Sequence, residues 1–266
     1  MHALWDHSTH PEFYDYYAQA SVTPEALARF CRLRDGVVRV AASVGKAGPL
    51  DVADIGCGPG TLSVVWAEEG HRVSGIDISE QLIGLARERV RSSNVAVDFC
   101  IGSATDLPWP SGSMDVCCVP ELLEHVPDWR RCLGEFDRIL RQEGVLYLST
   151  SNVLCPRQAE FNIPGYSWFP PAAKRHVVRL ARSSRPELAN YATYPAVNWF
   201  SYYGLKAYLG RLGYRTLDRF DIAAMREQPV SRRLLLDLIC RLPPLRFLGH
   251  LASQGLILMA IKHRAG

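Results

Sequence analysis

A strand, a glycine-rich turn and a helix follow one another between residues 50 and 69, and this run constrains the fold more than any other part of the chain. Residues 50–55 are apolar and predict a buried strand, and residues 61–69 predict a helix. The turn between them reads D-I-G-C-G-P-G from Asp54 to Gly60. Glycine at such a turn lets the backbone approach a ligand, because a Cβ would block the approach or forbid the dihedral angles. The run therefore predicts a ligand site.

Strand and helix patterns alternate along most of the chain. Strands are expected at residues 50–55, 72–76, 95–100, 114–119, 145–149, 214–220 and 255–261. Helices are expected at residues 23–44, 61–69, 79–91, 127–144 and 203–212. This order predicts an α/β, doubly wound, Rossmann-like sheet of seven mostly parallel strands covered on both faces. Ligands gather at the carboxyl ends of the strands in such a sheet.

Two long stretches do not fit a minimal sheet. Residues 152–200 predict an inserted cap with its own helix near residues 172–183, and residues 223–253 separate the last two strands. The cap is rich in aromatic side chains, namely Phe161, Tyr166, Trp168, Phe169, Tyr191, Tyr194, Trp199 and Phe200. These side chains either form a wall for a substrate or pack the insertion itself. The whole is expected to be a single domain with an N-terminal helical segment (1–47), a core (48–151), the cap (152–200) and a C-terminal part (201–266).

Two acids accompany the glycine turn. Asp54 lies two residues before the first glycine, and Asp77 ends the second predicted strand. The spacing G-x-G-x-G, with an acid before it, suits a cationic ligand better than a pyrophosphate. Here the sequence resembles the class I S-adenosylmethionine-dependent methyltransferases. The resemblance implies that Asp54 and the glycines hold the amino acid end of the cofactor and that Asp77 holds its ribose hydroxyls.

The resemblance extends to the loop after the third strand, Gly102 to Pro108, which lines the adenine in this family. Members often have an acid directly after the glycine, where this chain has Ser103, and Asp106 is the nearest acid. A serine hydroxyl can still bond the adenine amino group, though more weakly than a carboxylate. The residues expected to bind S-adenosyl-L-methionine are Asp54, Gly56, Cys57, Gly58, Gly60, Asp77, Ile78, Ser103, Ala104 and Pro120.

A cluster of acids and a histidine follows the fourth strand. Glu121, Glu124 and His125 are spaced to share one face of a short helical turn that Pro127 ends. Such donors can bind Mg²⁺, Mn²⁺ or Zn²⁺. The E-x-x-E-H pattern is similar to that of the ubiquinone-pathway O-methyltransferases and of the small-RNA 2′-O-methyltransferases, where it implies metal ligands. A solvated acidic turn, or His125 as a lone general base, are the alternatives.

Composition restricts compartment and partners. The 266 residues carry a net charge of +3, and their eight cysteines show no C-x-x-C spacing, which favours reduced cytoplasmic thiols. Residues 1–10 have no apolar signal segment. Residues 232–242 form an apolar stretch flanked by arginines, which is expected to pack against the sheet or, as the second choice, to lie in a membrane interface. A nucleic acid partner is not expected, and the oligomeric state is left open.

The expected activity is methyl transfer from S-adenosylmethionine to a hydroxyl of a small molecule: a quinone-like or lipid-like acceptor, or a saccharide. His125, or a metal held there, would activate the hydroxyl, and Tyr166, Trp168 and Trp199 would contact the acceptor. The alternatives are N-methylation of a small-molecule amine and a non-catalytic cofactor-binding subunit.

Overall fold

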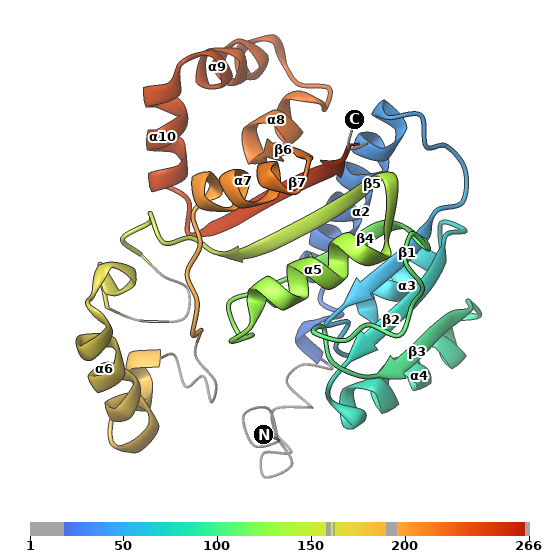
Figure 1. Cartoon of the computed structure of the whole chain (residues 1–266), viewed down its shortest axis with the longest axis horizontal. Coiled ribbons are helices and arrows are strands. Elements are labelled where there is room, and N and C mark those ends of the chain that lie inside the picture. Colours follow the sequence, from blue (N-terminus) through green and yellow to red (C-terminus); the bar gives the residue numbers. More distant parts are fainter. Residues whose placement is uncertain (1–18, 158–160, 162, 190–195, 264–266) are drawn as a thin grey trace. The chain divides into compact units, whose positions relative to one another are not determined.

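The computed structural model describes residues 19–157, 161, 163–189 and 196–263 (Figure 1). Residues 1–10, Tyr191 and Tyr194, which enter the predictions above, lie outside the described residues. The strands are β1 (Asp51–Ile55), β2 (Arg72–Asp77), β3 (Val97–Ile101), β4 (Met114–Pro120), β5 (Leu140–Ser151), β6 (Tyr214–Asp218) and β7 (Gly255–Lys262). The helices are α2 (Pro24–Ser43), α3 (Thr61–Ala67), α4 (Glu80–Ser93), α5 (Trp129–Ile139), α6 (Pro171–Ser183), α7 (Tyr202–Arg211), α8 (Arg219–Ala224), α9 (Val230–Arg241) and α10 (Pro243–Leu251), with short 3-10 helices at Tyr166–Trp168 and Pro186–Ala189.

The seven strands form one sheet in the order β3-β2-β1-β4-β5-β7-β6. β1 pairs in parallel with β2 and β4, and β2 pairs in parallel with β3. The arrows of β5 and β7 point in opposite directions (Figure 1). The strand order reverses on either side of β1, which is the topology of a doubly wound sheet. The predicted fold class is therefore confirmed.

Local signals place most helix starts correctly. Thr23 and Ser79 accept hydrogen bonds from the first turns of α2 and α4, and Asp128 does the same for α5. The predicted end of α5 at Gly144 is wrong, because the helix ends at Ile139 and Gly144 lies inside β5. A Cβ at Gly144 would lie 2.7 Å from the carbonyl oxygen of Arg141, so glycine is required there by close backbone approach.

The chain divides into two compact units, which are described separately. Unit 1 comprises Met1–Pro120, Asp128–Tyr147 and Ala260–Gly266, and unit 2 comprises Glu121–Pro127 and Leu148–Met259. Unit 1 has a large core in which Trp66, Phe136 and Ile83 are fully buried. The predicted boundaries at residues 47, 151 and 200 stay a prediction.

The segment between β6 and β7 differs from the expectation of burial. In α9 only Leu236 is buried, and most of its other leucines face solvent. Hydrophobic composition alone cannot tell which face of a helix is covered, and here the covered face is narrow. Within the part of the chain that the structure describes, no helix is long and apolar enough to cross a bilayer.

Candidate functional site

The glycine turn of unit 1 has the backbone that its sequence predicts. Gly56, Gly58 and Gly60 all have positive φ angles, of 72°, 53° and 74°. A Cβ at Gly60 would lie 2.8 Å from Ala86 Cβ and 2.9 Å from Phe99 Cζ, so only glycine lets α3 begin this close to its neighbours. At Gly58 no atom lies within 4 Å of a hypothetical Cβ, so the turn is open on that side.

Asp54 is the buried acid of this turn. The Ser63 hydroxyl donates to its Oδ2 at 2.6 Å, while its Oδ1 has no hydrogen-bond partner among the described residues. Burial, with a smaller contribution from the charge of Asp77, raises the pKa of Asp54 to about 7. A buried carboxylate oxygen without a partner is costly, and a cationic ligand group would remove that cost. The geometry fits the ammonium group of an amino acid.

Asp77 lies at the carboxyl end of β2 and is tied to the same turn. Its carboxylate accepts hydrogen bonds from the backbone N–H of Gly58 and of Ser79, both at 2.9 Å. Burial raises its pKa in spite of these bonds. Asp77 pairs in register with Ile101 of β3, and both Ile78 and Ile101 expose about half of their surface, at 54% and 49%. A carboxylate beside exposed apolar side chains suits a ligand with hydroxyls and a flat ring.

Some residues of this turn could not be found from the sequence. Arg89 of α4 donates to the carbonyl oxygen of Pro59 at 3.0 Å and to the Thr61 hydroxyl, and so ties the turn to α4. Ser63 supports Asp54 in a similar way. The Arg89 contacts depend on how α4 packs beside the turn and α3, and the Ser63 contact depends on how α3 packs on β1, so no local pattern marks either residue.

The remaining predicted cofactor residues lie at strand ends of unit 1. Cys57 is buried within the turn, and burial raises the pKa of its thiol well above the ordinary value. The Ser103 hydroxyl lies 2.8 Å from the Thr105 hydroxyl and accepts from the Thr105 N–H, so it is used within its own loop. Ala104 and Pro120 are half-buried. Their contact with a cofactor stays a prediction.

The acidic turn, Glu121–Pro127, belongs to unit 2. Glu121 adopts a positive φ of 50°. Glu124 is fully buried and its Oε2 accepts from the Thr150 hydroxyl at 2.7 Å, whereas Glu121 is exposed and its Oε1 accepts from the Ser149 hydroxyl. The segment is a turn and not a helix, as Pro127 predicted.

These conformations correct the prediction of a metal site. Helical spacing would have put Glu121, Glu124 and His125 on one face, but the left-handed conformation of Glu121 breaks that spacing. Among the described residues, no group of three or more His, Cys, Asp and Glu side chains is arranged to hold a metal ion.

Asn198 of the insertion holds the acidic turn in place. Its side-chain amide donates to the carbonyl oxygens of Leu123 and Val126, and the backbone N–H groups of Val197 and Asn198 donate to that of Glu124. Burial lowers the pKa of His125 to about 4, so its imidazole is neutral near pH 7. No sequence signal could have paired Asn198 with this turn, because more than seventy residues separate them.

The aromatic residues of the insertion have different roles. Tyr166 is fully buried and stacks on Phe161 with ring centroids 3.8 Å apart. Trp199 contacts Tyr166 edge-on, and Lys174 Nζ lies 3.9 Å from its ring centroid. Trp168, in contrast, is 57% exposed, and its indole N–H donates to the Val153 carbonyl oxygen. Tyr166 is thus a core residue of the insertion, which corrects its assignment to an acceptor wall.

The fold is that of the class I S-adenosylmethionine-dependent methyltransferases: a seven-stranded sheet of this order that carries the glycine turn with its two acids. Residues 53–148 match the family described as "Methyltransferase domain". The chain is 40% identical to a ubiquinone biosynthesis O-methyltransferase of Xanthomonas oryzae pv. oryzae over 102 residues. The matched stretch covers 38% of this chain and 43% of that one. It is 37% identical over 119 residues to the enzyme of the same name from Aromatoleum aromaticum, covering 44% and 49%.

Solved structures agree on the fold. The plantazolicin methyltransferase BpumL, in complex with a triazolic desmethylPZN analog and SAH, is similar with a TM-score of 0.60 and 18% identity, covering 97% of this chain and 93% of that one. The YcgJ protein of Bacillus subtilis is similar with a TM-score of 0.55 and 18% identity, covering 87% and 99%. The chain spans less than half the length of the curated relatives quoted above.

Proposed function

We propose that the chain binds S-adenosylmethionine at the glycine turn of unit 1 and transfers its methyl group to a hydroxyl of a small molecule. The observation that carries the proposal is Asp54, whose buried Oδ1 lacks a partner among the described residues beside three glycines with positive φ. Asp54 would accept from the cofactor ammonium, and Asp77 would accept from the ribose hydroxyls. When bound, the cofactor would supply a methyl group on a sulfonium, and the acceptor oxygen would attack that methyl group in line with the leaving sulfur.

The chain's own contribution to the chemistry is positioning and removal of a proton. We assign the proton to His125, because burial keeps its imidazole neutral and able to accept one. Because burial makes this imidazole a weaker base than a free histidine, we expect it to serve a more acidic hydroxyl better than a less acidic one. A phenol, with a pKa near 10 as in tyrosine, is a better match than an alcohol or a saccharide hydroxyl. The relatives named ubiquinone biosynthesis O-methyltransferase support oxygen as the atom methylated.

Two alternative functions can be separated from this proposal by experiment. An N-methyltransferase would act on an amine, which carries its own lone pair once deprotonated. A non-catalytic subunit would bind the cofactor without turnover. Transfer of a labelled methyl group to a panel of phenols, alcohols and amines separates the three, because only the first gives labelled ethers with phenols.

Cofactor binding is tested at Asp77. We expect Asp77→Ala to weaken binding of S-adenosylhomocysteine roughly ten- to a hundredfold, since two charge-assisted hydrogen bonds to the ribose would be lost. Isothermal titration calorimetry measures the affinity. Asp98→Ala is the matched control, because Asp98 is an exposed acid on the adjacent strand β3. Equal affinities of Asp77→Ala and wild type, both folded by circular dichroism, would remove the cofactor assignment.

A further inference from the structure

Helices α9 and α10 of unit 2 carry a large exposed apolar surface, here called the α9–α10 face. It consists of Val230, Leu234, Leu235, Leu238, Leu242, Phe247 and Leu248, with exposed fractions from 43% to 76%. Val230, Leu234 and Leu238 recur every four residues and form one row along α9, and Leu242, its C-cap, continues the spacing. Scattered single leucines on a surface are ordinary, but a continuous row is a sign of a binding surface.

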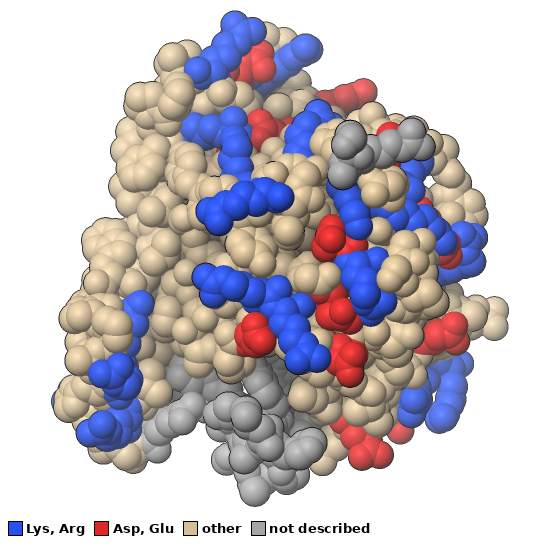
Figure 2. Space-filling model, viewed as in Figure 1, with Lys and Arg blue, Asp and Glu red and all other residues tan. Residues whose placement is uncertain are grey.

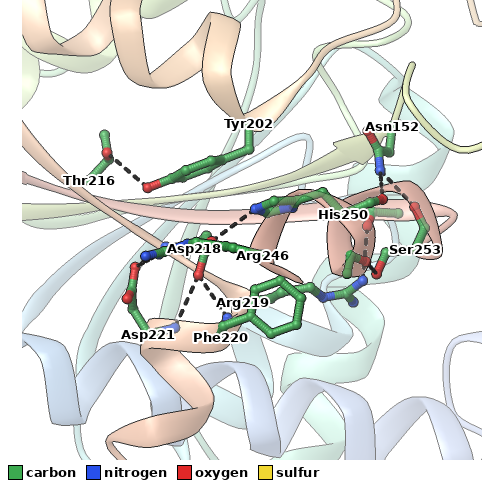
Figure 3. Close-up of polar contacts among 12 residues, drawn as sticks. Asn152, Tyr202, Thr216, Asp218, Arg219, Phe220, Asp221, Arg246, His250 and Ser253 are labelled. Carbon is green, nitrogen blue, oxygen red and sulfur yellow. Dashed lines mark hydrogen bonds and ion pairs between the residues drawn. The ribbon is translucent and has the colours of Figure 1, made fainter. Parts of the chain in front are cut away.

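The polarity of α10 is reversed with respect to an ordinary surface helix. Arg246 and His250, four residues apart, turn inward to Asp218, whose side chain is fully buried (Figure 3). Arg246 Nε lies 2.6 Å and His250 Nε2 2.9 Å from Asp218 Oδ2. Burial opposes ionisation of Asp218, but hydrogen bonds from His250 and Arg246 outweigh it and hold its pKa well below the ordinary value. The charged side of α10 is thus anchored inside.

This anchoring fixes which side of α10 meets solvent. His250 stacks on Tyr202, and its carbonyl oxygen accepts from the Asn152 amide (Figure 3). A Cβ at Gly249 would collide with the ring of Phe220, so α10 is packed closely where it faces inward. Phe247 and Leu248 lie on the remaining side and are exposed. Their exposure therefore results from a specific internal network.

Positive charge accompanies the apolar face. Arg232, Arg233 and Arg241 are exposed on α9, whereas its one acid, Asp237, is half-buried. Glu227 is an exposed acid just before the helix. Figure 2 shows basic side chains around α9, with an acidic side chain between them and uncharged surface beside them. Leucines beside arginines match the boundary between lipid chains and anionic headgroups.

We propose that the α9–α10 face docks on a membrane surface that contains anionic lipids, with α9 lying in the plane of the interface. Penetration would be shallow, because no described helix is suited to span the bilayer. A second copy of the chain fits the face less well. A twofold interface brings a patch against itself, and three arginines would then meet three arginines with few acids to compensate.

Vesicle flotation tests the proposal directly. We expect the full chain to float with phosphatidylcholine vesicles that contain about one third phosphatidylglycerol, and to bind less as salt is raised. Leu234→Glu with Leu238→Glu should lower the partition coefficient about tenfold or more, since two leucines can no longer be buried in lipid. Leu212→Glu is the matched control, because Leu212 is similarly exposed (40% against 47% for Leu238) but ends α7.

A second variant separates charge from burial and does not touch apolar packing. Arg232→Gln with Arg233→Gln should lower binding to anionic vesicles by about fivefold per arginine and leave binding to pure phosphatidylcholine unchanged. The proposal is overturned if the wild type does not bind vesicles, or if both double variants bind as the wild type does. It is also overturned if the leucine variant converts a dimer to a monomer in sedimentation while vesicle binding is absent, which would assign the face to a second copy.

Discussion

Asp54 is the buried acid beside the glycine turn, and its carboxyl group titrates near neutral pH. Burial raises its pKa to about 7, so its protonation state changes near neutral pH. A cationic amino group beside Oδ1 would stabilise the carboxylate and lower that pKa. Ligand binding and proton release are then coupled at one residue.

This coupling predicts how affinity changes with pH. S-adenosylhomocysteine should bind more tightly as the pH rises from about 6 to 8, by up to tenfold per unit below the pKa of Asp54 in the ligand-free protein. Titration calorimetry at pH 7, in two buffers with different ionisation enthalpies, should show release of a fraction of a proton. Asp54→Asn should abolish that release, and Asp98→Asn should not. Equal release from Asp54→Asn and wild type would refute the role of Asp54.

Residue roles could be predicted only where a local pattern records them. Asp54 and Asp77 follow from their places beside the turn and at a strand end, and the structure puts both at that turn. Arg89 and Asn198 act through contacts made after folding, so the sequence does not mark them. The prediction that Glu121 shares a helical face with Glu124 and His125 was wrong, because residue spacing does not reveal the left-handed backbone conformation of Glu121.

Among the elements, the insertion after β5 has a small core of its own. Phe161, Tyr166, Val177 and Ala181 are buried together, with Trp199 packed against them. Lys174, which lies over Trp199, also donates to the Ser167 carbonyl oxygen. The aromatic composition of this segment is therefore explained largely by packing, and Trp168 is the exception.

Two substitutions separate packing from recognition. Tyr166→Ala should lower the free energy of unfolding by about 3–5 kcal/mol, because it leaves a cavity in this small core. Trp168→Ala should cost only about 1 kcal/mol, the value of one hydrogen bond, and should raise the acceptor KM while leaving cofactor affinity unchanged. Urea unfolding and steady-state kinetics measure the two effects. An unchanged KM in Trp168→Ala would remove this residue from acceptor binding.

Helix and strand boundaries were predictable where caps exist and not where tertiary contacts decide. Thr23, Ser79 and Asp128 mark helix starts that the structure confirms. Gly144 resembled a helix end but serves a close approach within β5. For residues 232–242 the sequence favoured packing against the sheet and kept an exposed, interfacial helix as its second choice, because the inward turn of Arg246 and His250 depends on Asp218, far away in the sequence.

For the whole molecule, two buried groups give the stability opposite dependences on pH. The pKa of Asp54 rises on folding from 3.8 to about 7, so the folded chain keeps a proton that the unfolded chain has lost, and stability falls as pH rises through this range. The pKa of His125 falls on folding from 6.5 to about 4, so stability falls as pH drops through that range. Between about pH 4.5 and 6 the two contributions oppose each other.

Substitution of either group should reveal the pH dependence of stability that the other group contributes. Relative to wild type, the stability of Asp54→Asn should increase with pH between about 4.5 and 6, with a slope approaching 1.4 kcal/mol per unit. The stability of His125→Gln should decrease with pH over the same range. Urea denaturation at several pH values gives both slopes. Parallel pH profiles for the two variants would contradict the assigned protonation states.

The sheet topology of the whole chain was predictable because alternation of strands and helices permits few arrangements, and the seven-stranded order confirms it. What the alternation could not express is how the two long insertions fold. Their structure depends on aromatic packing in one case and on an internal ion network in the other.

Cys57 adds a chemical consequence to the geometry of the glycine turn. Its thiol lies between two glycines, is buried, and has a pKa well above the ordinary value, so it is a poor nucleophile in the folded turn. Alkylating reagents or peroxide could attack this sulfur only when the turn opens. The rate at which Cys57 is modified would therefore report how often the turn opens, and a ligand that keeps the turn folded would slow oxidation of this sulfur.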